Sequence, residues 1–370
     1  MKRGSSDALW SFRLIYIAAA AVMMLGVLAV ILSAVIKDDS SLKVGCVLIG
    51  CAQGDSERID ENVAGMKKAC ENTQTPLLIK ENIAADTADC EKAARELIAE
   101  GCRVIMLPCR GSGDIVRTFA DKYRNITFCL SAAGSSSENI VYCCGRIYQG
   151  RYLCGMVAGQ TTLTKVVGYV AAMPCPEVYR SVNAFVLGVK SADPEVTVKV
   201  TFSGEWDNEQ LEREAVKRLA SMNADVIAYQ QDGNNAADAC EELGIDYVCS
   251  RVIPEPHTEH LLVSSTCDWE NIYGKVIRDG ISGKCSEHGT YWLGLNEGGI
   301  FMSELSPNVR IPAATAYEKA RAELLSGPDV FSGVIWDRDG TLRCGLGEVI
   351  SDEVLLSGMN WLIEGAEIDE

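Results

Sequence analysis

One pattern occurs twice in this chain, as LIAEGCRVI at residues 97–105 and as LASMNADVI at residues 219–227. Each copy predicts the end of a helix, a turn through a left-handed residue (Gly101 or Asn223), and then a buried strand. Because the same helix–turn–strand unit appears in both halves of the chain, we expect two lobes of similar construction.

Strand-like and helix-like segments alternate around both copies. The pattern predicts strands at 43–49, 77–80, 103–107, 126–130, 166–172, 196–202 and 225–229. It predicts helices at 57–71, 87–100, 115–122, 178–191 and 208–222. Asp86 and Asp207 stand where a side chain can cap the following helix. Continuous apolar strands that alternate with helices are typical of parallel sheets covered on both faces.

We therefore predict an α/β protein of two doubly wound parallel-sheet lobes that meet at a hinge. The first lobe is expected to span 43–162, completed by part of 270–330. The second is expected to span 163–268, completed by part of 331–365. Ligands of doubly wound sheets bind outside the carboxyl ends of the strands, so a cleft between the lobes is the expected site.

An apolar run without a charge covers residues 14–36. About 20 apolar residues are enough for a helix to cross a bilayer. Basic residues precede the run and Asp38 and Asp39 follow it, so residues 1–13 should stay in the cytoplasm and the remainder should face outward. We predict a single-pass anchor in the cell membrane, with a cleaved signal peptide as the alternative.

The net charge of −17 at pH 7 excludes a nucleic-acid partner, because an acidic surface repels phosphates. An uncharged small molecule escapes this repulsion. The sequence shows no nucleophile elbow and no dinucleotide fingerprint, and His257 and His260 have no third metal ligand in a recognisable motif. We expect no enzyme activity, no cofactor and no metal.

Sixteen cysteines follow the apolar run. Cys46, Cys102 and Cys129 lie in or beside strand-like runs, and Cys90 and Cys154 lie on apolar helix faces, where they replace small hydrophobic residues. No paired CxxC motif indicates a structural zinc site. This spacing favours buried free thiols, and a few disulfides remain the alternative.

Several long motifs resemble one known family. They are GRIYQGRYLCG at 145–155, VGYVAA at 167–172, PEVYRSVNAF at 176–185, GLGEVISDE at 345–353 and GMNW at 358–361. In this order they resemble the BMP ("basic membrane protein") family of ABC-transporter substrate-binding proteins over about 43–365. The resemblance implies the type I periplasmic-binding fold and capture of a purine nucleoside or nucleobase for an ABC permease complex.

Capture would occur by closure of the hinge on the ligand. The first alternative is a membrane-anchored ligand sensor or regulator of the same fold, because some relatives are regulators. A nucleoside-processing enzyme is the second alternative. One departure concerns the ligand itself: many relatives carry an acid that can hold ribose where this chain reads Cys249-Ser250-Arg251. A free base therefore stays as plausible a ligand as a nucleoside.

Two tryptophans are the candidate stacking surfaces for a flat base. Trp206 follows the strand at 196–202, where the family places an aromatic residue against the base. Asp268 and Trp269 begin a helix at a position where the family places an Asn-Trp or a charged residue near the ligand. Trp269 would then be a second aromatic wall, and the alternative for Trp206 is a packing role at a helix–strand corner.

Polar residues after the strands are the remaining candidates. Each group lies in a loop expected to face the cleft, and the alternative is an ordinary turn or helix cap. Asn183 differs, because it lies inside the helix at 178–191. The candidates are Gln53, Gly54, Asp55, Arg110, Gly111, Asp232 and Asn183.

Overall fold

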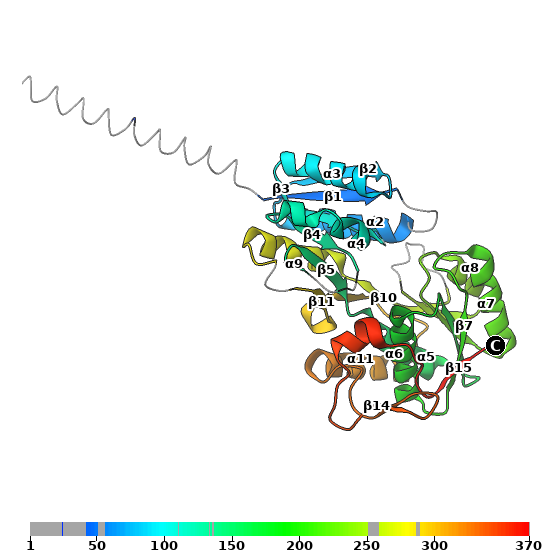
Figure 1. Cartoon of the computed structure of the whole chain (residues 1–370). Coiled ribbons are helices and arrows are strands. Elements are labelled where there is room, and N and C mark those ends of the chain that lie inside the picture. The colour runs from blue at the N-terminus through cyan, green and yellow to red at the C-terminus, as the bar shows by residue number, and fades with distance from the viewer. Residues whose placement is uncertain are drawn as a thin grey trace, which may run out of the picture.

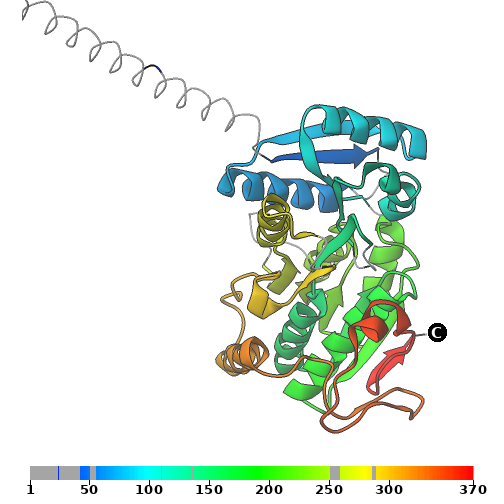
Figure 2. The same ribbon diagram turned by 60° about the vertical axis from the view of Figure 1, so that its left-hand side comes forward.

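Two mainly parallel sheets organise the chain into two lobes, as Figures 1 and 2 show. The computed structural model describes Met24 and residues 42–50, 56–109, 111–132, 134, 137–250, 259–285 and 289–369. The sheets are joined by three crossovers within these described residues, at 145–147, 267–269 and 293–300. Both lobes are therefore built from segments that are far apart in the sequence.

The first lobe has a six-stranded sheet in the order β11-β5-β4-β3-β1-β2, and every pairing in it is parallel. Its strands are β1 (Lys43–Ile49), β2 (Leu77–Ile83), β3 (Cys102–Leu107), β4 (Thr127–Leu130), β5 (Ile140–Gly145) and β11 (Tyr291–Leu293). Its helices are α2 (Ser56–Asn72), α3 (Thr87–Ala99), α4 (Ser112–Arg117), the 3₁₀ helix η1 (Ala120–Tyr123) and α9 (Trp269–Ile281).

Alternate residues of the central strands face opposite layers of this lobe. Val104 and Met106 of β3 pack with residues of α2 and α9, whereas Ile105 and Leu107 pack with residues of α3 and α4. Both faces of the strand are buried, which explains its unbroken apolar sequence. The continuous apolar strands therefore predicted correctly that helices cover both faces of this sheet.

The second lobe has a seven-stranded sheet in the order β12-β10-β9-β8-β6-β7-β15, in which only the pairing of β10 with β12 is antiparallel. Its strands are β6 (Val166–Ala171), β7 (Thr197–Phe202), β8 (Val226–Tyr229), β9 (Asp246–Cys249), β10 (Leu261–Cys267), β12 (Ile300–Met302) and β15 (Ala366–Ile368). Its helices are α5 (Ile147–Thr161), α6 (Pro176–Ala192), α7 (Glu209–Ser221), α8 (Asn235–Leu243) and α11 (Ile311–Ser326). A small hairpin, β13 (Ile335–Trp336) with β14 (Leu342–Cys344), lies outside this sheet.

The first crossover lies earlier than the predicted boundary at 162–163. Helix α5 packs against α6, α11 and β10, all of which belong to the second lobe. The chain therefore changes lobes at Gly145–Ile147, before α5 rather than after it. Its central residues Leu153, Cys154 and Val157 are all buried, so the helix is apolar on several sides and its pattern does not indicate which sheet it covers.

Two predicted helix caps have different outcomes. The Asp86 carboxylate accepts a hydrogen bond from the Asp89 backbone N–H (2.9 Å), which confirms it as the cap of α3. Asp207 does not cap α7, because the Asn208 side chain takes that role and accepts a bond from the Leu211 N–H (3.2 Å). The Asp207 carboxylate instead accepts a bond from the Asn235 amide.

No helix in the described part of the chain is both long enough and apolar enough to cross a membrane. The predicted anchor at 14–36 lies outside the described residues except for Met24. Membrane anchoring through this segment stays a prediction.

Glycines let the backbones of α5 and α6 touch. A Cβ at Gly188 would clash with the Tyr152 carbonyl oxygen, and one at Gly155 would clash with the Phe185 carbonyl oxygen. A Cβ at Gly159 would lie 2.9 Å from the Val189 carbonyl oxygen, which is also too close. Backbone atoms cannot move aside as a flexible side chain can, so these positions admit only glycine.

We expect Gly188→Ala to destabilise the protein by about 3 kcal/mol, because the added methyl group must push two buried helices apart. Gly358→Ala is the matched control: its Cβ would lie 3.7 Å from the nearest atom, and its cost should stay below about 0.5 kcal/mol. Urea unfolding of the two variants measures the difference. Equal midpoints for the two variants would contradict the close contact between α5 and α6.

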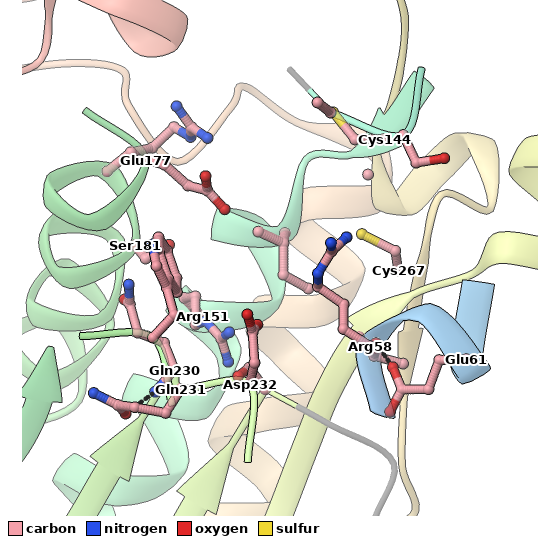
Figure 3. A pocket seen from close by; sticks show the side chains of 18 of the residues that line it. Arg58, Glu61, Cys144, Arg151, Glu177, Ser181, Gln230, Gln231, Asp232 and Cys267 are labelled. Carbon is pink, nitrogen blue, oxygen red and sulfur yellow. Dashed lines mark hydrogen bonds between the residues drawn. The ribbon is translucent and has the colours of Figure 1, made fainter. Parts of the chain in front are cut away.

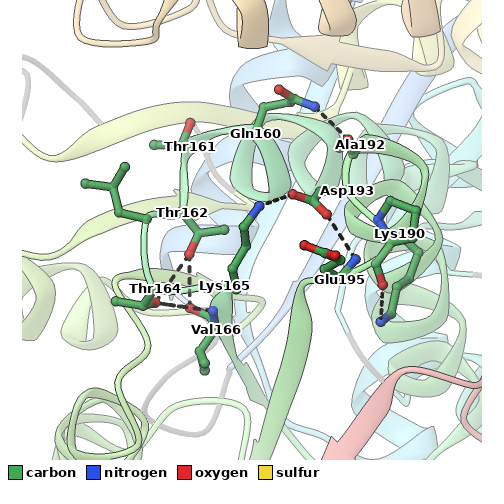
Figure 4. Close-up of polar contacts among 12 residues, drawn as sticks. Gln160, Thr161, Thr162, Thr164, Lys165, Val166, Lys190, Ala192, Asp193 and Glu195 are labelled. Atoms are coloured by element: carbon green, nitrogen blue, oxygen red, sulfur yellow. Dashed lines mark hydrogen bonds and ion pairs between the residues drawn. The ribbon is translucent and has the colours of Figure 1, made fainter.

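Polar contacts join the C-terminal ends of α5 and α6 and the residues that follow them (Figure 4). The Gln160 amide donates to the Ala192 carbonyl oxygen (2.6 Å), and Lys165 pairs with Asp193. Asp193 also accepts a bond from the Glu195 N–H (2.9 Å). The two helices are thus joined by backbone contact along their length and by hydrogen bonds at one end.

Candidate ligand-binding site

A cavity of about 400 Å³ lies between the lobes (Figure 3). The first lobe contributes Arg58 and Glu61 from α2 and Ser131 from the end of β4. The second lobe contributes the loops that follow β6, β7, β8 and β9, together with the first turns of α5 and α6. These loops follow the carboxyl ends of parallel strands, the usual place for a ligand in doubly wound sheets. The volume is in the range of small-molecule sites.

Trp206 lines this cavity from the second lobe. It lies in the loop between β7 and α7 and is partly buried against the core of that lobe. Its carbonyl oxygen accepts a hydrogen bond from the Asp232 N–H (2.8 Å), which joins this loop to the loop after β8. Asp232 lines the cavity as well. Both predicted residues therefore lie at the seam between the lobes.

Trp269 lines the same cavity from the side of the first lobe. It is the first residue of α9, and its ring is stacked on Tyr273 with centroids 5.5 Å apart and an interplanar angle of 28°. The Tyr273 hydroxyl is held by the Asn62 side chain (2.9 Å) and by Ser131. The indole is thus supported from behind by a ring that is itself fixed in place.

Two buried arginines line the cavity from adjacent helices of the second lobe, Arg151 on α5 and Arg180 on α6. They are 6% and 3% exposed. Each is held by one terminal nitrogen: Nη1 of Arg151 donates to the Ser265 hydroxyl (3.4 Å), and Nη1 of Arg180 donates to the Leu355 carbonyl oxygen. Arg180 also lies over the Trp292 ring, 5.3 Å from its centroid.

The amide of Gln230 has a fixed orientation at the cavity wall. The Tyr169 hydroxyl donates to its Oε1 (2.6 Å), so the amide NH₂ is the group available to a ligand. Tyr169 is fully buried, and burial raises the pKa of its hydroxyl, which keeps the proton on the donor.

Three cysteines also line the cavity: Cys144, Cys175 and Cys267. Of the fifteen cysteines in the described residues, these three alone keep appreciable exposure, and the other twelve are buried. Burial raises the pKa of Cys267 to about 12. Burial, reinforced by the neighbouring Cys267 thiol, raises the pKa of Cys144 well above its usual value. Both remain neutral thiols at physiological pH.

Three of the other predicted site residues, Asn183, Asp268 and Gly111, do not line the cavity. Asn183 is fully buried; its amide donates to the Trp361 carbonyl oxygen (2.9 Å) and its Oδ1 accepts from the Ile363 N–H (3.0 Å). Asp268 caps α9 through the Asn271 N–H (3.0 Å). Gly111 is exposed at the start of α4. Gln53, Gly54, Asp55 and Arg110 lie outside the described residues.

Sequence reasoning missed Arg151 and Arg180, although α5 carries a signal for the first. Arg151 is the only charged residue between Ile147 and Thr161. A charge inside an otherwise apolar helix must be stabilised by a specific partner, so such a residue is a site candidate. Among the described residues, no three histidine, cysteine or carboxylate side chains converge to hold a metal ion.

Two sheet-based lobes, three crossovers within the described residues and a cavity at the seam define the periplasmic-binding type of fold. The fold is shared with a solute-binding protein from Conexibacter woesei (TM-score 0.63, 18% identity, covering 79% of this chain and 100% of that one). It is also shared with a transcriptional activator of the comK gene from Bacillus halodurans (TM-score 0.67, 20% identity, 77% and 98% covered).

The chain belongs to the family of PnrA-like ABC transporter substrate-binding proteins, which it matches over residues 43–322. It is 31% identical to a candidate ABC transporter glucose-binding protein of Haloferax volcanii, covering 76% of this chain and 69% of that protein. It is 27% identical to a purine-binding protein of Brucella abortus, covering 89% and 94%. The resemblance seen in the sequence motifs is thereby confirmed.

Proposed function

We propose that this protein captures a purine nucleobase or nucleoside between its lobes and presents it to an ABC importer. The observation that carries the proposal is the pair of indoles, Trp206 and Trp269, which line one cavity from opposite lobes. A purine has two flat faces, and stacking of a base on an aromatic ring is worth about 1–3 kcal/mol. Cavity residues on both lobes suit a ligand that is held from two sides.

Binding would couple to closure of the cleft. The lobes are connected only through the crossovers at 145–147, 267–269 and 293–300 within the described residues, so rotation at these segments changes the distance between the two indoles. A ligand that contacts both lobes stabilises the closed form because it binds that form better. An ABC permease could then recognise the closed form. The predicted anchor at 14–36 would keep the protein beside the permease.

The two relatives described above are named for different classes of ligand, a purine and a sugar. The purine-binding relative supports the proposal, and the glucose-binding relative supplies its strongest competitor. The cavity favours the purine because its walls combine two indoles with arginine and amide donors. Many relatives carry an acid that can hold ribose where this chain has Ser250, which lines the cavity. Asp232 also lines the cavity, and its carboxylate could accept hydrogen bonds from ribose hydroxyls in place of that acid.

A thermal-shift screen of purine bases, purine nucleosides, glucose and ribose tests the proposal. A purine at one hundred times its Kd should stabilise the protein by about 2.7 kcal/mol, which for a chain of this size raises the Tm by about 4 °C. A response to glucose or ribose, with none to any purine, would refute the proposal. Release of free base from a nucleoside would instead indicate an enzyme.

The exposed thiols report where the ligand binds. We expect a purine that raises the Tm to slow the alkylation of Cys175, which lies at the cavity wall and is partly exposed. Cys102 is fully buried and should stay unmodified with or without ligand. Peptide mass spectrometry after a timed exposure to iodoacetamide measures both sites. Equal labelling of Cys175 with and without ligand would place the ligand elsewhere.

A further inference from the structure

We infer that this site selects purines that present two adjacent hydrogen-bond acceptors, the O6 and N7 edge of an oxopurine, and that it rejects adenine-type purines. Arg151 is the residue assigned to this edge, and Arg180 is a second buried arginine on the same wall. The inference rests on the proposed function, because it names which purines the cavity takes.

The two arginines share one arrangement. In each, Nη1 is tied to the protein, to the Ser265 hydroxyl for Arg151 and to the Leu355 carbonyl oxygen for Arg180. In each, Nε is buried and has no hydrogen-bond partner within the part of the chain that the structure describes. The Nε and Nη2 atoms of an arginine form a planar fork that matches two neighbouring acceptors. Each side chain is therefore held in position with its bidentate edge unused.

Burial makes an unused donor costly. Both arginines are more than nine-tenths buried and both line the cavity. A buried donor without a partner costs about 1–3 kcal/mol, and more when it is charged. A ligand that supplies acceptors recovers this cost, whereas one that supplies another donor does not. The Gln230 NH₂ adds a further donor to the same lobe's wall, since its carbonyl oxygen is taken by Tyr169.

The charges around the cavity favour a neutral ligand over an anion. The described lining residues include three arginines and three carboxylates: Arg58, Arg151, Arg180, Glu61, Glu177 and Asp232. Their formal charges cancel, so a phosphate group would gain no net attraction on entering. A purine base or nucleoside is neutral and carries both acceptors and donors. It can therefore use the arginine wall on one edge and the carboxylates on another.

The acceptor edge separates the two kinds of purine. Hypoxanthine and guanine present O6 and N7 as neighbouring acceptors, and arginine pairs with both at once. Adenine presents N7 beside an amino group, which is a donor. Arginine has no acceptor, so it would face that amino group with an unsatisfied donor. One bidentate pair discriminates by about tenfold to a hundredfold in affinity.

Calorimetry on the purified protein tests the inference with inosine and hypoxanthine against adenosine and adenine. We expect the oxopurine of each pair to bind at least about tenfold more tightly. Equal or tighter binding of the adenine-type purine would overturn the inference and leave the proposed function standing. Failure of all four compounds to bind would refute the proposed function and the inference together. This comparison uses the unaltered protein, so it does not depend on the folding of a variant.

Arg151→Gln adds a second test, because glutamine pairs with the N6 and N7 atoms of adenine. We expect this variant to lower the affinity ratio of hypoxanthine to adenine by at least about tenfold. Arg124→Gln is the control, since its side chain is 74% exposed and does not line the cavity, and it should keep the parent ratio. An Arg151→Gln protein with a native Tm and an unchanged ratio would show that Arg151 does not read the ligand.

Discussion

Trp206→Ala should abolish the stabilisation that a purine gives the native protein, while the ligand-free protein keeps its fold. The indole lines the cavity and is only partly buried, so its removal leaves no sealed void in the core. The lost stacking of about 1–3 kcal/mol lowers the affinity by up to about two orders of magnitude. Trp206→Phe should restore most of the response, because phenylalanine keeps an aromatic face.

The control for this prediction is Trp336→Ala. Trp336 is another partly exposed indole, 45% accessible, but it lies on the β13–β14 hairpin and does not line the cavity. Its removal should leave the ligand-induced Tm shift unchanged. Thermal-shift measurements on the three variants, with and without purine, decide the matter. A full shift in Trp206→Ala would mean that this indole is a packing residue.

A loss of stability at alkaline pH is the second large effect, and it follows from the buried thiols. Burial raises the pKa of Cys70 and of Cys102 from 9.0 to about 11, and that of Cys267 to about 12. Above pH 9 the unfolded chain therefore releases protons that the folded chain retains. The free energy of unfolding falls as pH rises, by up to about 1.4 kcal/mol per thiol and pH unit.

Between pH 9 and pH 10 these three thiols together should lower the free energy of unfolding by about 3 kcal/mol, which lowers the Tm by about 4 °C. Thermal unfolding in a non-thiol reductant measures the change. Salt at about 0.5 M screens the repulsion between surface charges, which also grows with pH in an acidic protein. Cys102→Ala should make the fall shallower, by up to about 1.4 kcal/mol per pH unit. A Tm that stays constant from pH 8 to pH 10 would contradict the shifted pKa values.

The sheet layers could be predicted from sequence because buried strands leave a plain signal. The run at 103–107 and strand β3 (Cys102–Leu107) agree to within one residue, since both faces of this strand require apolar side chains. The strand β5 (Ile140–Gly145) was not predicted as a strand, although it leads directly into the first crossover. The boundary between the lobes was misplaced for a related reason: α5 is apolar on several sides and has no single exposed face.

The sequence predicted the site residues whose position follows from the order of strands and helices alone. Trp206 and Asp232 follow β7 and β8, the two parallel strands on either side of β6, and such loops meet at one edge of a sheet. Asn183 was misassigned because the sequence shows an amide in a helix but not the carbonyl oxygen of Trp361, which is 178 residues away in the chain and accepts its hydrogen bond. Arg151 and Arg180 were missed because no loop marks them. Their role depends on how α5 and α6 pack.

The glycine contacts between α5 and α6 decide what kind of movement the second lobe can transmit. With Tyr152 and Phe185 carbonyl groups pressed against Gly188 and Gly155, neither helix can slide along the other. The lobe therefore behaves as a single solid block, and occupancy of the cavity alters the angle between blocks rather than the shape of either one. A partner that contacts only one lobe would not detect whether the ligand is bound. Only a surface that spans both could tell a loaded molecule from an empty one.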